Sequence, residues 1–141
     1  MLGARALSNI LWSCAALGYS PPPEVLARVW TGSAQTLAEA SPQALGNMLW
    51  AVASLELAPS SGWMAAWQQA ALAGLQQQQW NCADVANAAW ALGKFAGSVK
   101  LRHLLPPVPW RLALMRAAKA AVSGGAAAAA AGVLRPVRLW P

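Results

Sequence analysis

Apolar positions recur with the period of an α-helix in three stretches of the chain, and the three patterns match. The stretches Gly3 to Tyr19, Ser41 to Leu57 and Asn81 to Gly97 align without gaps, at offsets of 38 and 40 residues. At about 100° per residue, the first stretch has a main apolar stripe and a second ridge formed by Trp12 and Tyr19. The main stripe consists of Leu7, Ile10, Leu11, Cys14 and Leu17. A helix with two apolar faces packs between two neighbours, so the pattern predicts three equivalent inner helices.

Each of the three stretches carries an asparagine three residues before a tryptophan. The pairs are Asn9 with Trp12, Asn47 with Trp50, and Asn87 with Trp90. These asparagines lie on the one strip of the helix surface that is polar or small in every stretch. The strip contains Arg5, Asn9, Ala16, Gln43, Asn47, Ser54, Ala83, Asn87 and Lys94. Because stacked parallel helices would align these positions, we expect one continuous strip along the molecule.

A second helix is expected after each of these stretches, because proline marks its start. The starts read PPPEVLARVW from Pro21, PSSGWMAAW from Pro59 and PPVPWRLALM from Pro106. Proline is tolerated in the first turn of a helix, where its missing N–H would have no partner. The inner helices have boundary signals of their own, namely Ser41 and Asn81 as N-caps, and Gly18 and Gly97 as C-terminal stops.

The unit of helix, proline-bearing turn and helix is expected to occur about three times in an all-α fold. Hairpins of this length bury their faces by stacking into an α-solenoid, of right or left hand. The expected organisation is repeat 1 over residues 1–40, repeat 2 over 41–80, repeat 3 over 81–122 with an insertion at 98–105, and a tail over 123–141. The tail is rich in alanine and glycine, basic near its end, and expected to be disordered. Neither end carries a polar cap, which is typical of a fragment of a longer array.

Charged residues are few and unevenly placed. The chain is 57% hydrophobic and 10% charged, yet no run provides the ~20 consecutive apolar residues of a spanning helix, so we expect no membrane insertion. The net charge is +6, and residues 94–141 hold eight Lys or Arg and no acidic residue. Such a block suits a polyanion, either a nucleic acid or an anionic membrane surface, or else it is a solvated tail without a partner.

The sequence does not indicate catalysis. Its four acidic residues are scattered, His103 is its single histidine, and it lacks a phosphate-binding loop, zinc-ligand spacing or a nucleophile turn. Cys14 and Cys82 lie in apolar helical stretches and are interpreted as small buried hydrophobic residues. We therefore expect a protein that is not an enzyme and that uses no cofactor or metal. The pattern does not indicate an oligomeric state.

Two interpretations of the asparagine strip stay open. In the first, each amide bonds a backbone carbonyl or the next asparagine in an internal ladder, since buried amides need such partners. In the second, the strip faces RNA, the amides pair with base edges, and the neighbouring indoles stack on bases. Tryptophan is more often a core residue, and this expectation applies to Trp12, Trp50, Trp90, Trp30, Trp63 and Trp67.

These motifs resemble one known family. The Asn-x-x-Trp helix, the PPPE turn after LGY and the period of 38 residues are similar to the octotricopeptide repeat family, abundant in green algae and related to FAST-kinase-like proteins, which often carry a RAP domain. The resemblance covers about residues 3–95 and is closest in LSNILWSCAALGYSPPPEVLARVW, which begins at Leu7. The second unit has APSSGW in place of the PPPE turn, and no RAP domain is visible.

The resemblance implies a protein that binds single-stranded RNA in a chloroplast or mitochondrion and acts in mRNA stability, processing or translation. By the same resemblance, the base-facing residues are Arg5, Asn9, Gln43, Asn47, Ser54, Asn87 and Lys94. The implied phosphate contacts are Lys100, Arg102, Arg111, Arg116 and Lys119. A protein-binding scaffold and a non-functional fragment of a longer repeat protein are the alternatives, since a fold does not settle a function.

Overall fold

The structure is a computed structural model that describes the backbone of residues 2–130 and the side chains of residues 2–124. Every regular element within residues 2–130 is helical, which confirms the expected all-α class. The α-helices are α1 (Ala4–Leu17), α2 (Pro23–Ser33), α3 (Pro42–Ser54), α4 (Ser61–Gln76), α5 (Cys82–Gly97) and α6 (Val108–Ala130). Two short 3₁₀ helices are present as well, η1 (Ala34–Glu39) after α2 and η2 (Arg102–Leu104) between α5 and α6.

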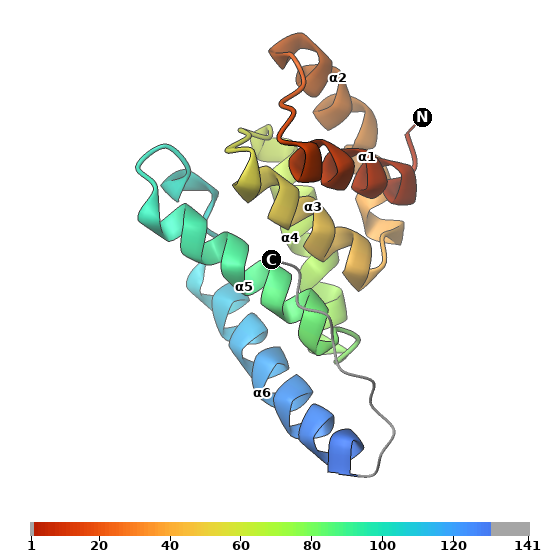
Figure 1. Cartoon of the computed structure of the whole chain (residues 1–141), viewed down its shortest axis with the longest axis vertical. Helices are drawn as coiled ribbons and strands as arrows, with labels where there is room; N and C mark the ends of the chain where they lie inside the picture. Colours follow the sequence, from red (N-terminus) through yellow and green to blue (C-terminus); the bar gives the residue numbers. More distant parts are fainter. Residues whose placement is uncertain (1, 131–141) are drawn as a thin grey trace.

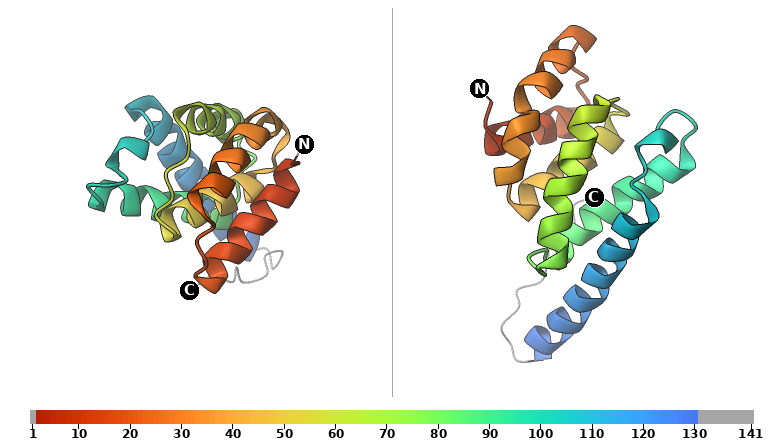
Figure 2. Two further views of the ribbon diagram at one scale, coloured as in Figure 1. Left: turned by 90° about the horizontal axis from the view of Figure 1, so that it is seen from above. Right: turned by 180° about the vertical axis from the view of Figure 1, so that it is seen from behind.

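The helices lie in two layers. In the first layer α1, α3 and α5 lie side by side, and α3 contacts both of the others (Figure 1). Behind them lie α2, α4 and α6, with η1 packed on α4 and α6 packed on both α4 and α5 (Figure 2). The three stretches that share the asparagine pattern therefore form one layer, and the proline-initiated helices form the other.

The predicted starts of the inner helices α3 and α5 are confirmed by their cap geometry, whereas α4 begins at Ser61, two residues after the predicted Pro59. Ser41 caps α3 by accepting a hydrogen bond from the Ala44 backbone N–H at 3.1 Å, and Pro42 is the first helical residue. Asn81 caps α5 and forms a capping box with Asp84, whose carboxylate accepts from the Asn81 backbone N–H at 3.1 Å. Asp84 is buried, and desolvation raises the pKa of its carboxyl group even though this hydrogen bond favours the charged form.

The helix ends follow the prediction only in part. Gly18 ends α1 in the left-handed region with φ 67°, which glycine adopts without steric cost. Gly97 is instead the last residue of α5, and Ser98 is the cap that follows it. Helix α6 continues to Ala130, past residue 123 where the tail was expected to begin, because alanine is the strongest helix former. The rest of the expected tail, residues 131–141, lies outside the described residues.

The tryptophans of the second layer lie in the core, as expected. Trp30, Trp63 and Trp67 are all buried. The ring centroids of Trp30 and Trp63 are 4.9 Å apart, and those of Trp67 and Trp110 are 5.5 Å apart. These pairs join α2 to α4 and α4 to α6, so aromatic contacts run through the whole second layer.

Indole hydrogen bonds connect the buried helices further. Trp63 Nε1 donates to Ser33 Oγ at 3.0 Å, and the Ser33 hydroxyl in turn donates to the Val29 carbonyl at 2.6 Å. Trp67 Nε1 donates to the Leu45 carbonyl of α3 at 3.0 Å, which joins the two layers. Each acceptor spares a buried indole N–H a cost of about 1–3 kcal/mol, whereas the buried Trp80 Nε1 has no such partner among the described residues.

Two residues of the predicted apolar stripe do not enter the core. The Ile10 side chain is 48% exposed and the Leu17 side chain is 82% exposed. Their counterparts in the next inner helices are covered, since Met48 of α3 and Phe95 of α5 are fully buried. Within the described residues no helix packs on this side of α1, so its stripe is open where those of α3 and α5 are closed.

Replacing Ser33 by Ala should destabilise the protein. The substitution removes the acceptor of the buried Trp63 N–H, so we expect the free energy of unfolding to fall by about 1–3 kcal/mol in urea titrations. Thr31→Ala is the matched control, because the exposed Thr31 hydroxyl donates to the carbonyl four residues earlier at 3.0 Å and no indole depends on it. The control should change stability by less than about 0.5 kcal/mol, and an equal decrease in both variants would contradict the role of the indole bond.

Candidate functional site

Four of the predicted strip residues line one polar groove between α1 and α3, which is called here the amide groove. The groove has a volume of about 520 Å³. Its lining consists of Arg5, Ser8, Asn9, Glu39, Ser41, Gln43, Ala44 and Asn47. Helix α1 contributes the first three, α3 and its cap contribute the last four, and Glu39 comes from the end of η1. Stacking two equivalent helices has thus brought together polar side chains that are almost forty residues apart in sequence.

The next helix joins this strip through a hydrogen bond between two asparagines. Asn87 Nδ2 of α5 donates to Asn47 Oδ1 of α3 at 3.3 Å. The bond is possible because α3 and α5 approach closely at Gly46. A Cβ on Gly46 would lie 3.3 Å from the Asp84 carbonyl oxygen and 3.6 Å from Asn87 Cβ. A larger residue at this position would therefore push the two helices and the two amides apart.

The ladder interpretation holds for only one step of the strip. Asn47 and Asn87 are half-buried and bonded to each other, whereas Asn9 is exposed and has no hydrogen-bond partner among the described residues. A primary amide has two donors and one acceptor oxygen, so one bond leaves further groups on both asparagines. Each asparagine consequently keeps hydrogen-bonding capacity that a ligand on this face can use.

The tryptophans of the strip helices form a row, and the expectation that they are core residues is only partly right. The Trp12 and Trp50 ring centroids are 6.4 Å apart, and those of Trp50 and Trp90 are 6.2 Å apart. Trp12 and Trp50 are half-buried, but Trp90 at the end of the row is 46% exposed. The indoles at α1 and α3 are therefore partly covered, and the indole at α5 is more accessible, since no further helix packs on Trp90 within the described residues.

Lys94 lies beside this open indole. Its ammonium nitrogen is 5.7 Å from the Trp90 ring centroid, within the range of a cation–π interaction. Both residues line a second groove of about 520 Å³ at the C-terminal end of α5. The other lining residues are Glu56, Gly93, Gly97, Ser98 and Leu101. The groove thus combines an accessible aromatic face with a positive charge.

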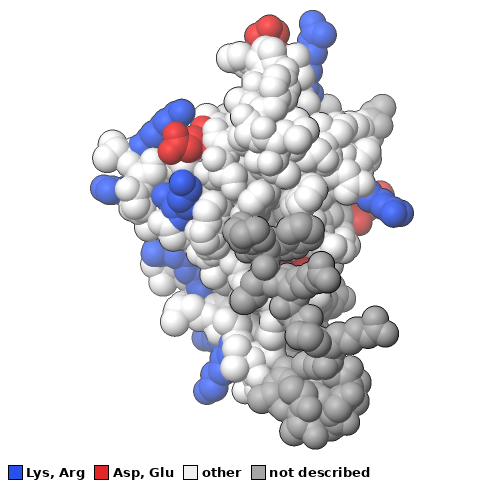
Figure 3. Space-filling view, viewed as in Figure 1, with Lys and Arg blue, Asp and Glu red and all other residues white. Residues whose placement is uncertain are grey.

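The remaining polar residue of the strip, Ser54, and the predicted phosphate contacts lie elsewhere. Ser54, at the end of α3, is half-buried and lines neither groove. The five cations expected to contact phosphate are all exposed, and they are Lys100, Arg102, Arg111, Arg116 and Lys119. Lys and Arg side chains gather along the side formed by α5 and α6, while the visible surface over α1 and α3 is largely uncharged (Figure 3). The structure therefore separates these cations from the amide groove.

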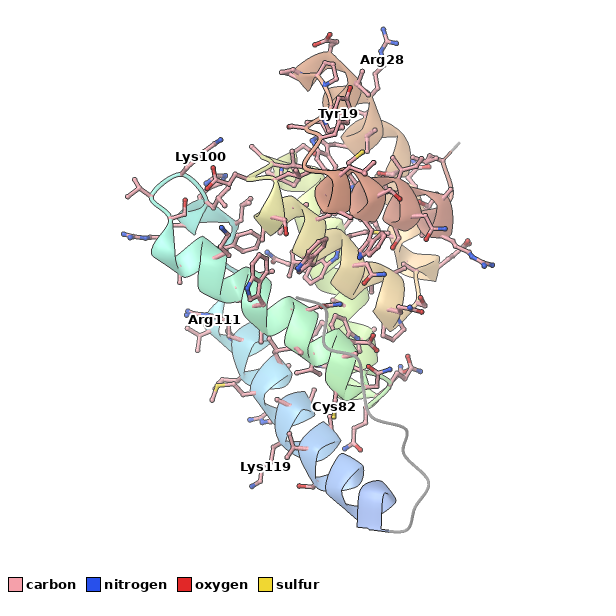
Figure 4. The ribbon with its side chains drawn as sticks, viewed as in Figure 1. Tyr19, Arg28, Cys82, Lys100, Arg111 and Lys119 are labelled. Atoms are coloured by element: carbon pink, nitrogen blue, oxygen red, sulfur yellow. The ribbon has the colours of Figure 1, made fainter. Side chains whose placement is uncertain are left out.

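The five cations lie on α6 and on the segment between α5 and α6. Arg111 and Lys119 lie on α6, and Lys100 lies at the turn after α5 (Figure 4). Lys100 also lines a third groove, of about 650 Å³, formed mainly by the proline-rich turn before α2 and the segment after α3. The positive charge is hence arranged as an edge along the molecule rather than as a single patch.

Sequence reasoning missed four residues of the amide groove. Ser8, Glu39, Ser41 and Ala44 line it, although none belongs to the strip deduced from the helical periodicity. Glu39 and Ser41 come from the turn before α3, whose path a periodicity argument does not give. Ser8 carried a usable signal, because it aligns with Gly46 and Ala86, and a small residue at all three positions indicates close helix packing.

Comparison of the chain with protein-family models, curated proteins and solved structures gives no match. Among the helices of residues 2–130, none has the length and apolar character required to cross a bilayer. Any assignment of function accordingly depends on the geometry above and on the resemblance of the sequence motifs.

A double-mutant cycle should detect the bond between Asn47 and Asn87. We expect the single variants Asn47→Ala and Asn87→Ala to be coupled by about 0.5–1.5 kcal/mol in the free energy of unfolding, because the two side chains share one hydrogen bond. The matched cycle between Asn9 and Asn47 should be additive within about 0.5 kcal/mol, since these amides line the same groove without bonding. Coupling of the same size in both cycles would contradict this assignment.

Proposed function

We propose that the protein binds single-stranded RNA across the face formed by α1, α3 and α5, and that it acts in post-transcriptional gene expression in a chloroplast or mitochondrion. The observation that supports RNA binding is the amide groove, in which strip residues of two successive helices meet. The organellar role, in mRNA stability, processing or translation, is supported only by the resemblance to octotricopeptide repeat proteins. A protein scaffold is the competing function, and the experiments below distinguish the two.

The proposed architecture is a short α-solenoid of three hairpins, α1 with α2, α3 with α4, and α5 with α6. In such an array each repeat can present equivalent side chains to one nucleotide of an extended strand. Asn9, Asn47 and Asn87 hold equivalent positions in the aligned sequence, and their side chains carry both donors and acceptors. In this proposal each asparagine contacts the edge of one base, and the bond between the last two fixes their orientation.

Stacking supplies the second part of the proposed interaction. Trp90 exposes nearly half of its surface, and an RNA base can stack on an accessible indole at a gain of about 1–3 kcal/mol. Lys94 beside it can neutralise the phosphate of the same or the next nucleotide. Trp12 and Trp50 are half-buried in the row, so they support the platform rather than form it.

Electrostatic attraction has a separate place in this proposal. Residues 1–93 contain two Arg against four acidic residues, so the base-reading part of the chain is net negative. The cations of α5, η2 and α6 lie along the border of this net negative part. An RNA strand whose bases contact the asparagines can place its phosphates beside these cations. Affinity would thus depend on the edge, and base preference would depend on the amides.

RNA binding should be measured by fluorescence anisotropy with the full chain and a labelled single-stranded RNA of mixed sequence. We expect the logarithm of the binding constant to fall with the logarithm of salt concentration, with a slope of about −0.7 per phosphate contact. Replacing Arg111, Arg116 and Lys119 by Ala should reduce that slope by about 0.7 for each phosphate that is no longer neutralised. No affinity at low salt, together with capture of a protein partner, would favour the scaffold function instead.

The triple variant Asn9→Ala, Asn47→Ala and Asn87→Ala tests the reading of bases. We expect it to weaken binding while leaving the salt slope unchanged, because amides that contact base edges neutralise no phosphate. The matched control replaces three exposed amides of the second layer, Gln35, Gln69 and Gln76, by Ala. Equal weakening in both triple variants, or a decrease in stability large enough to explain the weakening, would refute a reading role for the asparagines.

A further inference from the structure

One face of α1 is open although the same face is closed in the other two inner helices. This face, called here the open face of α1, consists of Ala6, Ile10, Ser13 and Leu17, and all four residues are exposed. Their spacing of four, three and four residues places them on one side of the helix. This face carries no charged side chain, and its two large apolar side chains, Ile10 and Leu17, are 48% and 82% exposed.

The corresponding faces of α3 and α5 show what kind of surface covers these positions. The aligned residues at α3 are Ala44, Met48 and Ala51 with the C-cap Leu55, and those of α5 are Asp84, Ala88, Ala91 and Phe95. All of them are buried except Leu55, which is half-buried. The α5 set lies against α3, as the contact between Asp84 and Gly46 shows. The covering surface is therefore the opposite face of the preceding inner helix.

That opposite face is itself open in one place in the described chain, on α5. The residues Ala86, Ala89, Trp90 and Gly93 define the open row of α5, and none of them is buried. Their counterparts in α1 and α3 are buried or half-buried, with Leu11 and Leu49 in the position of Ala89. The molecule thus exposes both halves of a contact that it already makes twice internally, between α1 and α3 and between α3 and α5.

We propose that a second copy of this chain occupies the open face of α1, with the open row of its α5 packed on that face. Such a contact is heterologous, because it joins two different surfaces, and it leaves one free face at each end of the pair. Base stacking on Trp90, which the proposed function invokes, would then be left to the copy whose α5 row stays free at the end of the assembly. The contact also continues an interface that the molecule already contains, and this argument selects a copy over an unrelated partner.

The experiment is to measure the mass of the full chain by sedimentation velocity as its concentration rises. We expect the mass to increase from the monomer value of 14.7 kDa through the dimer and beyond, because a heterologous contact need not close. Leu17→Lys blocks the open face of α1 and Ala89→Arg blocks the open row of α5, so each variant alone should remain a monomer. Both positions are exposed, so both variants should keep the helical circular dichroism of the parent.

Mixing the two variants gives the sharpest test. The Leu17→Lys copy keeps its α5 row and the Ala89→Arg copy keeps its α1 face, so we expect the mixture to form a dimer with one copy of each. Val99→Lys is the control, because Val99 is 89% exposed and lies outside both surfaces, and it should associate like the parent. A parent that stays monomeric at every concentration, a blocked variant that still associates, or a mixture that stays monomeric would each overturn the proposal. If Leu17→Lys fails to fold, Ile10→Lys takes its place, and if Ala89→Arg fails to fold, Gly93→Arg takes its place.

Discussion

The packing of α3 between α1 and α5 is the constraint on which the rest of the structure depends. Helix α3 must bury two faces at once, and almost all of its residues from Ala44 to Ala53 are buried. Gly46 makes this possible on the α5 side, because its missing side chain leaves room for the Asp84 carbonyl. Burial on both sides leaves only a narrow strip of α3 for polar side chains, and Gln43 and Asn47 occupy it.

The second layer holds that sandwich in place through its indoles. Trp67 of α4 donates to the Leu45 carbonyl of α3, and Trp110 of α6 donates to the Gln68 carbonyl of α4, both at 3.0 Å. Each bond satisfies a buried donor and fixes one helix against the next, so the second layer holds the layer of α1, α3 and α5 in position. Tryptophan serves both purposes here, since one side chain fills the core and also orients a neighbouring helix.

Periodicity and capping signals predicted the parts of this molecule that are decided locally. Ser41 and Asn81 cap their helices and Gly18 ends α1, because each acts on backbone groups within a few residues of itself. The exposure of Leu17 could not be predicted, since its pattern matches that of Phe95 and only the presence of a covering helix separates them. The bond between Asn47 and Asn87 was one of two open alternatives, because it depends on how closely two helices approach.

The same distinction explains why the site was found in outline and not in full. Residues on one helix face follow from spacing, so Asn9 and Asn47 were placed on the strip correctly and do meet in one groove. Glu39 enters that groove from a turn, and the position of the cations on α6 depends on the packing of α6 against α4 and α5.

The face of α1, α3 and α5 presents amides and indoles, and the cations lie at its border. The groups that could contact bases are therefore separate from the groups that could attract phosphates. On the proposed function, such a protein would select bases by uncharged contacts and hold the strand by charged ones, so that salt changes its affinity more than its preference.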